Sequence, residues 1–177
     1  MNCLLFYCLL FMITAAILTL SDKGSKGERE DLGGPLIREM ISCIGAIVEC
    51  CEIIPDEKGL LKEKLIAYCT KVDLVLTTGG TGLSPRDITP EATLEVIDKE
   101  VPGIAEAMRS AGLEKTKRAM LSRAVAGVRG NTLIINLPGS PKAVKEGLEA
   151  IMEVIPHAIE KIKGSSEDCA QLDGGRT

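Results

Sequence analysis

The stretch that decides the fold runs from Val72 to Ala92 and reads VDLVLTTGGTGLSPRDITPEA. Its first part, Val72 to Leu76, is a short apolar run without glycine or proline, which is typical of a buried strand in a parallel sheet. Three glycines then fall within Gly79 to Gly82, where a backbone without side chains can approach a ligand closely. Thr89 is a good N-cap and Pro90 a good first helical residue, so a helix is predicted to follow.

The glycine loop alone does not identify a ligand. It lacks the Gly-Lys-Ser/Thr ending of a P-loop and the full GxGxxG spacing of a dinucleotide-binding fold. A tight turn is therefore an alternative explanation for it. Asp87, beside Arg86, favours a functional role, because a carboxylate next to a nest of backbone N–H groups suits a site that holds phosphate through a divalent metal.

The composition is that of one ordinary globular domain. The chain has 177 residues, of which 45% are hydrophobic and 26% charged, and its net charge is −4. Only four residues are aromatic and there is no basic tract, so nucleic acid is not an expected partner. The seven cysteines form no CxxC pair, and reduced, mostly buried cysteines in a cytoplasmic protein are predicted. The single histidine, His157, is assigned no role.

The first twenty residues are apolar and long enough for a signal sequence or a marginal membrane span. No Lys or Arg precedes the apolar part, and Ala15 to Leu20 is predicted to be the first buried strand of the fold. A membrane location is therefore not expected, because the strand cannot lie in a bilayer and in the sheet. The predicted domain covers residues 14–164, with an apolar extension of unassigned purpose at 1–13 and a polar, disordered tail at 165–177.

Alternating strand and helix patterns fill the rest of the domain and predict a right-handed parallel sheet. The expected elements are a mobile loop over Ser21–Gly34, a helix over Pro35–Ile44, a strand over Ile47–Ile54, helices over Leu60–Cys69, Pro90–Lys99 and Pro102–Ala111, a hairpin within Met120–Asn136 that turns at Gly130 and lies at the sheet edge, and one long helix over Val144–Ile162.

Four loops leave the carboxyl ends of the predicted strands, and a doubly wound topology brings such loops to one crevice. They carry Ser21-Asp22, Asp56, Gly79–Asp87 and Asn136–Pro141. No Ser–His pair and no cysteine nucleophile with a base is present, so acids, hydroxyls and backbone donors must do the chemistry. That set suits phosphoryl or nucleotidyl transfer, in which positioning and a metal ion do most of the work. The alternatives are a turn cap for Asp87 and a helix N-cap for Asp56.

Four motif blocks occur together in the chain: SDKG, IPDE, TTGGTGLSPRDITPEA, and MLSRAVAGVRGNTLIINLPGSPKAV. In this order they resemble the molybdopterin adenylyltransferase family, which includes the G domain of gephyrin. The resemblance extends from about Ala15 to Gly164. It implies an α/β fold, a three-layer α/β/α sandwich with a mostly parallel sheet and an antiparallel edge hairpin, usually assembled as a homotrimer. It also implies transfer of AMP from Mg-ATP to the terminal phosphate of molybdopterin, with release of pyrophosphate.

The resemblance assigns roles to individual residues. Asp56 and Asp87 would be the catalytic aspartates and the ligands of Mg²⁺. The molybdopterin and nucleotide contacts would be Ser21, Asp22, Thr78, Gly79, Gly80, Thr81, Gly82, Arg86, Asn136, Pro138, Gly139 and Ser140. A hand-over of product to a molybdenum-insertion protein is a further implied partnership. Two alternatives stay open: a non-catalytic molybdopterin-binding or scaffold module, and a molybdenum-insertion or competence-damage-type relative that shares the domain.

Overall fold

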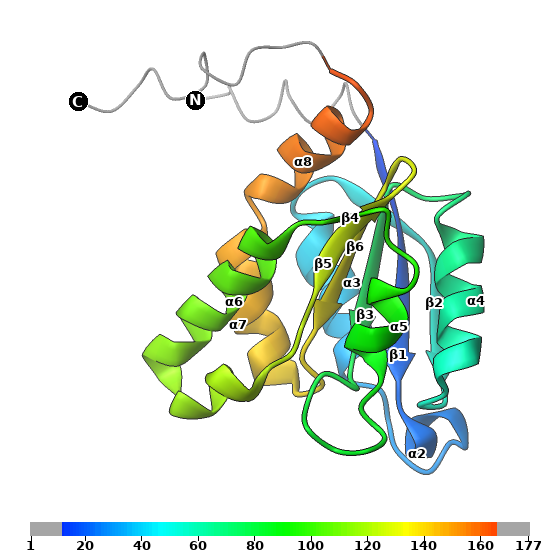
Figure 1. Cartoon of the computed structure of the whole chain (residues 1–177), viewed down its shortest axis with the longest axis vertical. Helices are drawn as coiled ribbons and strands as arrows, with labels where there is room; N and C mark the ends of the chain where they lie inside the picture. Colours follow the sequence, from blue (N-terminus) through cyan, green and yellow to red (C-terminus); the bar gives the residue numbers. More distant parts are fainter. Residues whose placement is uncertain (1–11, 166–177) are drawn as a thin grey trace.

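The chain forms a six-stranded sheet with helices on both faces, seen in a computed structural model that describes residues 12–165 (Figure 1). In chain order the elements are β1 (Ile13–Leu20), α2 (Asp22–Ser25), α3 (Gly33–Ser42), β2 (Ala46–Ile54), α4 (Lys58–Tyr68), β3 (Leu74–Thr78), α5 (Thr89–Leu94), β4 (Lys99–Glu100), α6 (Pro102–Lys115), the 3-10 helix η1 (Lys117–Leu121), β5 (Ala126–Arg129), β6 (Thr132–Leu137), α7 (Pro141–Ile151) and α8 (Val154–Ile162). No helix of the described part is long and apolar enough to cross a bilayer.

The strand order is β2-β1-β3-β6-β5-β4. The first four strands in this order are parallel, whereas β5 and β4 run antiparallel to their neighbours. The predicted three-layer α/β sandwich with a mostly parallel sheet and an antiparallel edge is therefore confirmed. Because β1, β2, β3 and β6 are parallel, the loops that follow them leave the same edge of the sheet.

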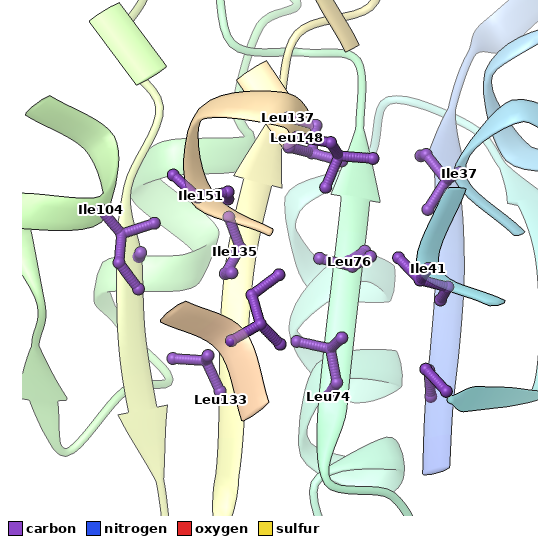
Figure 2. Close-up of a cluster of buried hydrophobic side chains, with 14 of the residues drawn as sticks. Ile37, Ile41, Leu74, Leu76, Ile104, Leu133, Ile135, Leu137, Leu148 and Ile151 are labelled. Atoms are coloured by element: carbon purple, nitrogen blue, oxygen red, sulfur yellow. The ribbon is translucent and has the colours of Figure 1, made fainter. Parts of the chain in front are cut away.

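Two hydrophobic clusters, one on each face, hold the sheet between its helices. Along β3, Leu74 and Leu76 pack into the cluster under α3, α6, α7 and α8, while Val75 packs on the other face with α4 and α5. Figure 2 shows Leu74 and Leu76 beside Ile41 and Ile135 in the first cluster. The alternation along one strand explains why the sequence of β3 is apolar through Leu76, since both of its faces are buried.

Several predicted boundaries on the site side of the sheet were wrong. The expected loop over Ser21–Gly34 contains the short helix α2, and α3 begins at Gly33. The helix expected over Pro90–Lys99 ends at Leu94, and Lys99–Glu100 forms the edge strand β4 outside the hairpin. Thr89 does not cap α5, because Ile88 holds the N-cap position and the Thr89 hydroxyl donates to the carbonyl of Gly79 at 2.9 Å.

In the middle of the chain, α6 runs to Lys115 and not to Ala111, and the other differences lie near the two ends. The long closing helix is two helices, α7 and α8, because Pro156 has no N–H to donate and its ring excludes an unbroken turn at Met152. Strand β1 begins at Ile13, which is 2% exposed, so this residue belongs to the core and not to an extension. Residues 1–11 and 166–177, which carry most of the predicted extension and tail, lie outside the described residues.

The described cysteines also differ from expectation. Cys43 and Cys51 are exposed, and Cys50 and Cys69 are half-buried. The prediction of mostly buried cysteines is therefore wrong for these four residues.

Gly59, in the first turn of α4, offers a simple test of where this helix begins. A Cβ atom at this position would meet nothing within 4 Å. The Gly59→Ala variant is expected to raise the free energy of unfolding by about 0.5–1 kcal/mol, because alanine loses less backbone entropy in a helix. Urea unfolding followed by circular dichroism measures this change, and a lower midpoint would contradict the described helix start.

Candidate active site

A cavity of about 420 Å³ opens at the carboxyl ends of the parallel strands, and we call it cavity 1. Its wall combines residues from all four loops predicted to converge. The residues that line it are Thr19, Leu20, Ser21, Gly24, Arg29, Glu30, Asp31, Leu32, Gly33, Ile53, Asp56, Thr78, Gly79, Gly80, Asp87, Gly139, Ser140 and Pro141. Both predicted catalytic aspartates therefore face one cavity together with the first half of the glycine loop.

The glycine loop lies against the neighbouring backbone. Gly79 and Gly80 have φ angles of 98° and 65°, which disfavour any residue with a side chain. A Cβ atom on Gly79 would lie 2.5 Å from the carbonyl oxygen of Leu20, and one on Gly80 would overlap the hydroxyl of Thr89. The Thr89 N–H donates to the carbonyl of Gly80 at 3.1 Å, which ties the loop to α5. These two glycines are thus required by the backbone path at the floor of cavity 1.

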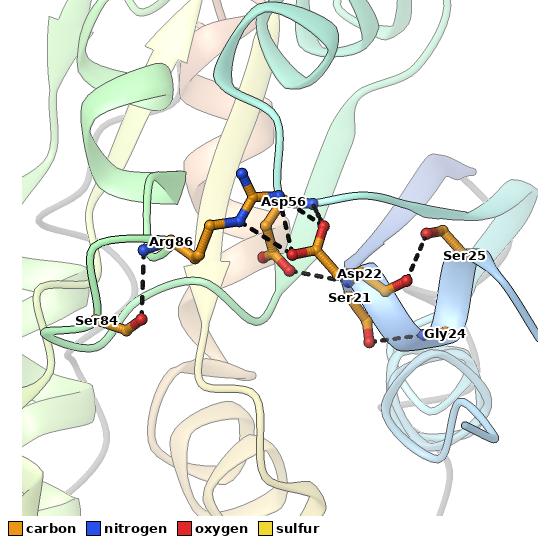
Figure 3. A network of polar contacts seen from close by, with 7 residues as sticks. All are labelled: Ser21, Asp22, Gly24, Ser25, Asp56, Ser84 and Arg86. Carbon is orange, nitrogen blue, oxygen red and sulfur yellow. Dashed lines mark hydrogen bonds and ion pairs between the residues drawn. The ribbon is translucent and has the colours of Figure 1, made fainter. Parts of the chain in front are cut away.

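Asp22 and Asp56 hold each other through reciprocal hydrogen bonds (Figure 3). The Asp22 N–H donates to Oδ2 of Asp56 at 3.0 Å, and the Asp56 N–H donates to Oδ1 of Asp22 at 3.1 Å. Arg86 adds a two-pronged contact, with Nε 3.0 Å from Oδ2 and Nη2 2.7 Å from Oδ1 of Asp22. Asp56 does not cap α4, since the N-cap residue is Glu57 without a side-chain bond, and the N-cap alternative is wrong.

The two carboxylates of this network have opposite electrostatic environments. Hydrogen bonds from Arg86, followed by the backbone N–H of Asp56, lower the pKa of Asp22 below its usual value. Burial raises the pKa of Asp56, and the negative charges of Asp22 and Asp87 raise it further. The hydrogen bond from the Asp22 N–H and the charge of Arg86 lower this pKa, but they do not offset the rise. The positive charge of Arg86 does not offset the burial of Asp56, so a further positive charge nearby would favour the ionised carboxylate.

Asp87 has both a structural and a cavity-facing position. Its Oδ2 accepts the N–H of Ser84 at 2.7 Å and so closes a turn, as the turn-cap alternative requires. Its side chain also lines cavity 1, and a Cβ atom on Gly82 would come within 2.8 Å of the same oxygen. The carboxylate therefore lies directly against the glycine loop.

A second cavity of about 360 Å³, called cavity 2, lies on the other side of the glycine loop. Thr81, Gly82, Pro138 and Ser140 line it together with residues of α6, η1 and α7. Gly79 and Gly80 face cavity 1, and Ser140 lines both cavities. The glycine loop and the Pro138–Ser140 segment thus form a shared wall between two spaces.

Three of the predicted contact residues line neither cavity. Asp22 and Arg86 act on the site through each other and through Asp56. Asn136 is fully buried, and its Nδ2 donates to the hydroxyls of Thr77 and Thr93 at 3.0 and 2.9 Å. Its position beneath the loop indicates a supporting rather than a contacting side chain.

Several charged residues at the site were missed from the sequence, including Arg29, Glu30 and Asp31 in the wall of cavity 1. Asp31 lines cavity 1, and its carboxylate accepts the N–H groups of Gly33 and Gly34 and the hydroxyl of Thr19. An Asp two residues before a helix start is a recognisable capping signal that could have identified it. Arg123, which lines neither cavity, was also missed; apart from its pairing with Glu91, its side-chain contacts are with the backbone carbonyls of Gly82 and Asp87.

The two carboxylates of Asp56 and Asp87 suit a divalent cation such as Mg²⁺ only if substrate phosphates supply further oxygen ligands. The described residues contain no group of three or more His, Cys, Asp or Glu side chains that could hold a metal ion. Mg²⁺ is commonly bound by one or two carboxylates together with substrate phosphates and water. Asp56 and Asp87, facing one cavity, fit this mode of binding.

Comparisons with known proteins agree with the geometry. Residues 16–157 match the family described as "Probable molybdopterin binding domain". The chain is 45% identical over 157 residues to the molybdopterin adenylyltransferase of Helicobacter pylori J99, a match that covers 86% of this chain and 89% of that protein. It is 42% identical over 154 residues to the Escherichia coli K12 protein of the same name, with 81% and 77% covered.

A solved structure extends the comparison to three dimensions. The crystal structure of the molybdopterin biosynthesis enzyme MoaB from Thermus thermophilus matches with a TM-score of 0.82 and 52% identity, over 87% of this chain and 98% of that one. The resemblance carried by the four motif blocks is therefore confirmed. This chain belongs to the molybdopterin-binding domain family of molybdenum cofactor biosynthesis.

Proposed function

We propose that the chain is a nucleotidyltransferase that moves AMP from ATP to the terminal phosphate of molybdopterin. The observation that carries the proposal is the shared wall, since the glycine loop separates cavity 2 from cavity 1, into which the carboxylates of Asp56 and Asp87 face. Cavity 1, with Asp56 and Asp87, suits the phosphates of ATP, and cavity 2 offers a more apolar space for the second substrate. The names of the bacterial relatives agree with this reaction.

The reaction needs positioning more than proton transfer. A molybdopterin phosphate oxygen attacks the α-phosphorus of ATP, a new P–O bond forms, and the bond to the pyrophosphate leaving group breaks. The attacking oxygen is already anionic at neutral pH, so no general base is required, and no histidine lines either described cavity. Asp56 and Asp87 would hold Mg²⁺, which when bound supplies positive charge beside the phosphates.

Backbone donors would offset the remaining repulsion between the two anions. Among the hydrogen bonds of residues 12–165, none uses the N–H groups of Gly80, Thr81 or Gly82. These groups lie along the shared wall, where they are free to donate to phosphate oxygens.

Incubation of the protein with molybdopterin and Mg-ATP tests the proposal directly. Adenylylated molybdopterin and one equivalent of pyrophosphate are the expected products, detected by mass spectrometry and a coupled pyrophosphate assay. Tight binding of molybdopterin without pyrophosphate release would instead favour the non-catalytic binding or scaffold alternative. The Asp98→Asn variant is a suitable control protein, because Asp98 accepts a backbone N–H from Gly130 and lines neither cavity.

The assembly and location of the protein belong to the same proposal. A homotrimer in the cytoplasm, with product passed to a molybdenum-insertion protein, is the assembly and location that the family resemblance implies. Light scattering measures the oligomer, and a molar mass of a monomer or dimer would contradict the trimer.

Removal of residues 1–11 is expected to leave a folded and active protein. Strand β1 begins at Ile13 and pairs with both β2 and β3, so the sheet needs no residue before Met12. A chain that starts at Met12 should therefore unfold within about 2 °C of the full chain, a difference worth less than about 0.5 kcal/mol. Differential scanning calorimetry and the adenylyl transfer assay check both properties. Recovery of the active full chain in a membrane pellet that resists carbonate would contradict the assignment of Ile13–Leu20 to the sheet alone.

A further inference from the structure

We propose that Arg123 is a positioning residue that clamps the loop between the glycine motif and Asp87. The inference rests on the proposed function for its kinetic readout, but the clamp itself can be measured without substrate. Arg123 lies between η1 and β5, and it lines neither cavity. Any effect on the reaction must therefore pass through the residues that it holds.

Arg123 binds both ends of this loop. Its Nε donates to the carbonyl of Gly82 at 2.6 Å, and its Nη2 donates to the carbonyl of Asp87 at 2.8 Å. The backbone N–H of Arg123 donates in addition to the carbonyl of Thr81 at 3.0 Å. One residue thus fixes the distance between the wall of cavity 2, at Thr81 and Gly82, and the carboxylate of cavity 1.

The clamp also sets the direction of the free backbone donors. In a planar trans peptide the C=O and N–H groups point in opposite directions. The carbonyls of Thr81 and Gly82 point to Arg123, so the N–H groups of Gly82 and Leu83 point away from it. No hydrogen bond within the described range uses these two N–H groups, and they remain available to an anionic oxygen.

Glu91 completes the arrangement from the first turn of α5. Its Oε1 pairs with Nη1 of Arg123, so all three nitrogens of the guanidinium group have acceptors. Its Oε2 is buried and has no hydrogen-bond partner among residues 12–165. Among the described residues Glu91 therefore pairs with Arg123 through Oε1 alone, and it orients the guanidinium group. A lysine could keep the charge at position 123 but could not reproduce the fork of donors.

The Arg123→Lys variant tests the clamp, with Arg129→Lys as the matched control. Arg129 is the last residue of β5, six positions after Arg123; it donates to the carbonyl of Val96 at 2.7 Å and lines neither cavity. We expect Arg123→Lys to lower kcat by about thirty- to a hundred-fold, because a displacement of about 1 Å costs about that much. The KM values for ATP and molybdopterin should stay within about three-fold, since the other walls of both cavities are unchanged.

Hydrogen exchange measured without substrate provides the second readout. The hydrogen-bonded amides of this loop, those of Ser84, Arg86 and Asp87, should exchange at least about ten-fold faster in Arg123→Lys than in the wild type, while those of β3 keep their rate. Arg129→Lys should change neither kcat nor exchange in this loop. If Arg123→Lys fails to fold, Glu91→Gln replaces it, with an expected three- to ten-fold loss of kcat, roughly the worth of one charge-assisted bond, and faster exchange in the same loop.

The outcomes separate the clamp from the proposed function. Wild-type transfer together with unchanged kcat in Arg123→Lys would overturn the inference. If the wild type itself transfers no AMP, the proposed function fails and the exchange experiment alone decides. Faster exchange confined to the bonded amides of Ser84, Arg86 and Asp87 then supports the clamp, and exchange equal to that of Arg129→Lys overturns it.

Discussion

Asp56→Asn is expected to lower the rate of adenylyl transfer by about 10²–10³-fold, a loss of about 3–4 kcal/mol in transition-state stabilisation. The amide keeps an oxygen for the N–H of Asp22, which lies 3.0 Å from the present carboxylate oxygen. The network of Asp22 and Arg86 therefore survives, and the loss comes from the missing charge toward Mg²⁺ and the phosphates. Steady-state kinetics with Mg-ATP and molybdopterin measures the effect.

The same substitution should leave the fold equally stable or more stable at pH 7. Burial raises the pKa of Asp56 in the folded chain above its unfolded value. Below the unfolded pKa both states are protonated and the side chain has no effect. As the pH rises, the unfolded state loses its proton first, so the ionised Asp56 lowers the free energy of unfolding at neutral pH. Asparagine removes this cost.

Thermal unfolding with and without Mg-ATP separates these two effects. Mg-ATP should raise the midpoint of the wild type and leave that of Asp56→Asn nearly unchanged, because bound ligand stabilises only the form that binds it. Asp98→Asn, which changes a turn carboxylate that lines neither cavity, should respond like the wild type. A wild-type rate in Asp56→Asn, or an equal response to Mg-ATP, would remove Asp56 from the reaction.

Much of the architecture was predictable because the parallel strands carry continuous apolar runs. Val75 and its neighbours in β3 are buried on both faces, and this pattern can be recognised without knowledge of contacts. The edge strand β4 could not be predicted, since its two residues, Lys99 and Glu100, are exposed and have no strand pattern. The break between α7 and α8 did have a local signal, Pro156, which the apolar spacing over Val144–Ile162 concealed.

The candidate site divides in the same way. Asp56, Asp87 and Gly79–Gly80 were singled out because they lie in loops that follow strands, and cavity 1 brings them together. The catalytic roles predicted for the two aspartates came from the family resemblance, because a helix N-cap and a turn cap were the interpretations that the residues alone favoured. The pairing of Arg86 with Asp22 spans 64 positions and depends on the final approach of two loops. Arg123 has one side-chain partner, Glu91, but its contacts with Gly82 and Asp87 are to carbonyl groups. Every residue has a carbonyl group, so the sequence of the loop does not indicate these contacts.

The glycine loop offers a pair of substitutions with opposite consequences, and the first is Gly79→Ala. Alanine would have to adopt a φ near 98° and place its Cβ 2.5 Å from the carbonyl oxygen of Leu20, which is backbone and cannot move aside. Strain and overpacking together are expected to lower the free energy of unfolding by about 3 kcal/mol. Urea unfolding measures it, and a loss below about 1 kcal/mol would contradict the described backbone path.

Gly82→Ala is expected to keep the stability and lose the activity. No positive φ constrains Gly82, and the nearest atom to its added Cβ is Oδ2 of Asp87, 2.8 Å away at the end of a side chain. The carboxylate can rotate aside at a cost below about 1 kcal/mol, but it then leaves the N–H of Ser84 and its place in cavity 1. A fall of about ten- to a hundred-fold in adenylyl transfer should result. If Gly82→Ala instead lost stability and activity in the same proportion as Gly79→Ala, the loop would be a turn only. The position of the Asp87 carboxylate would then not depend on its contact with Gly82.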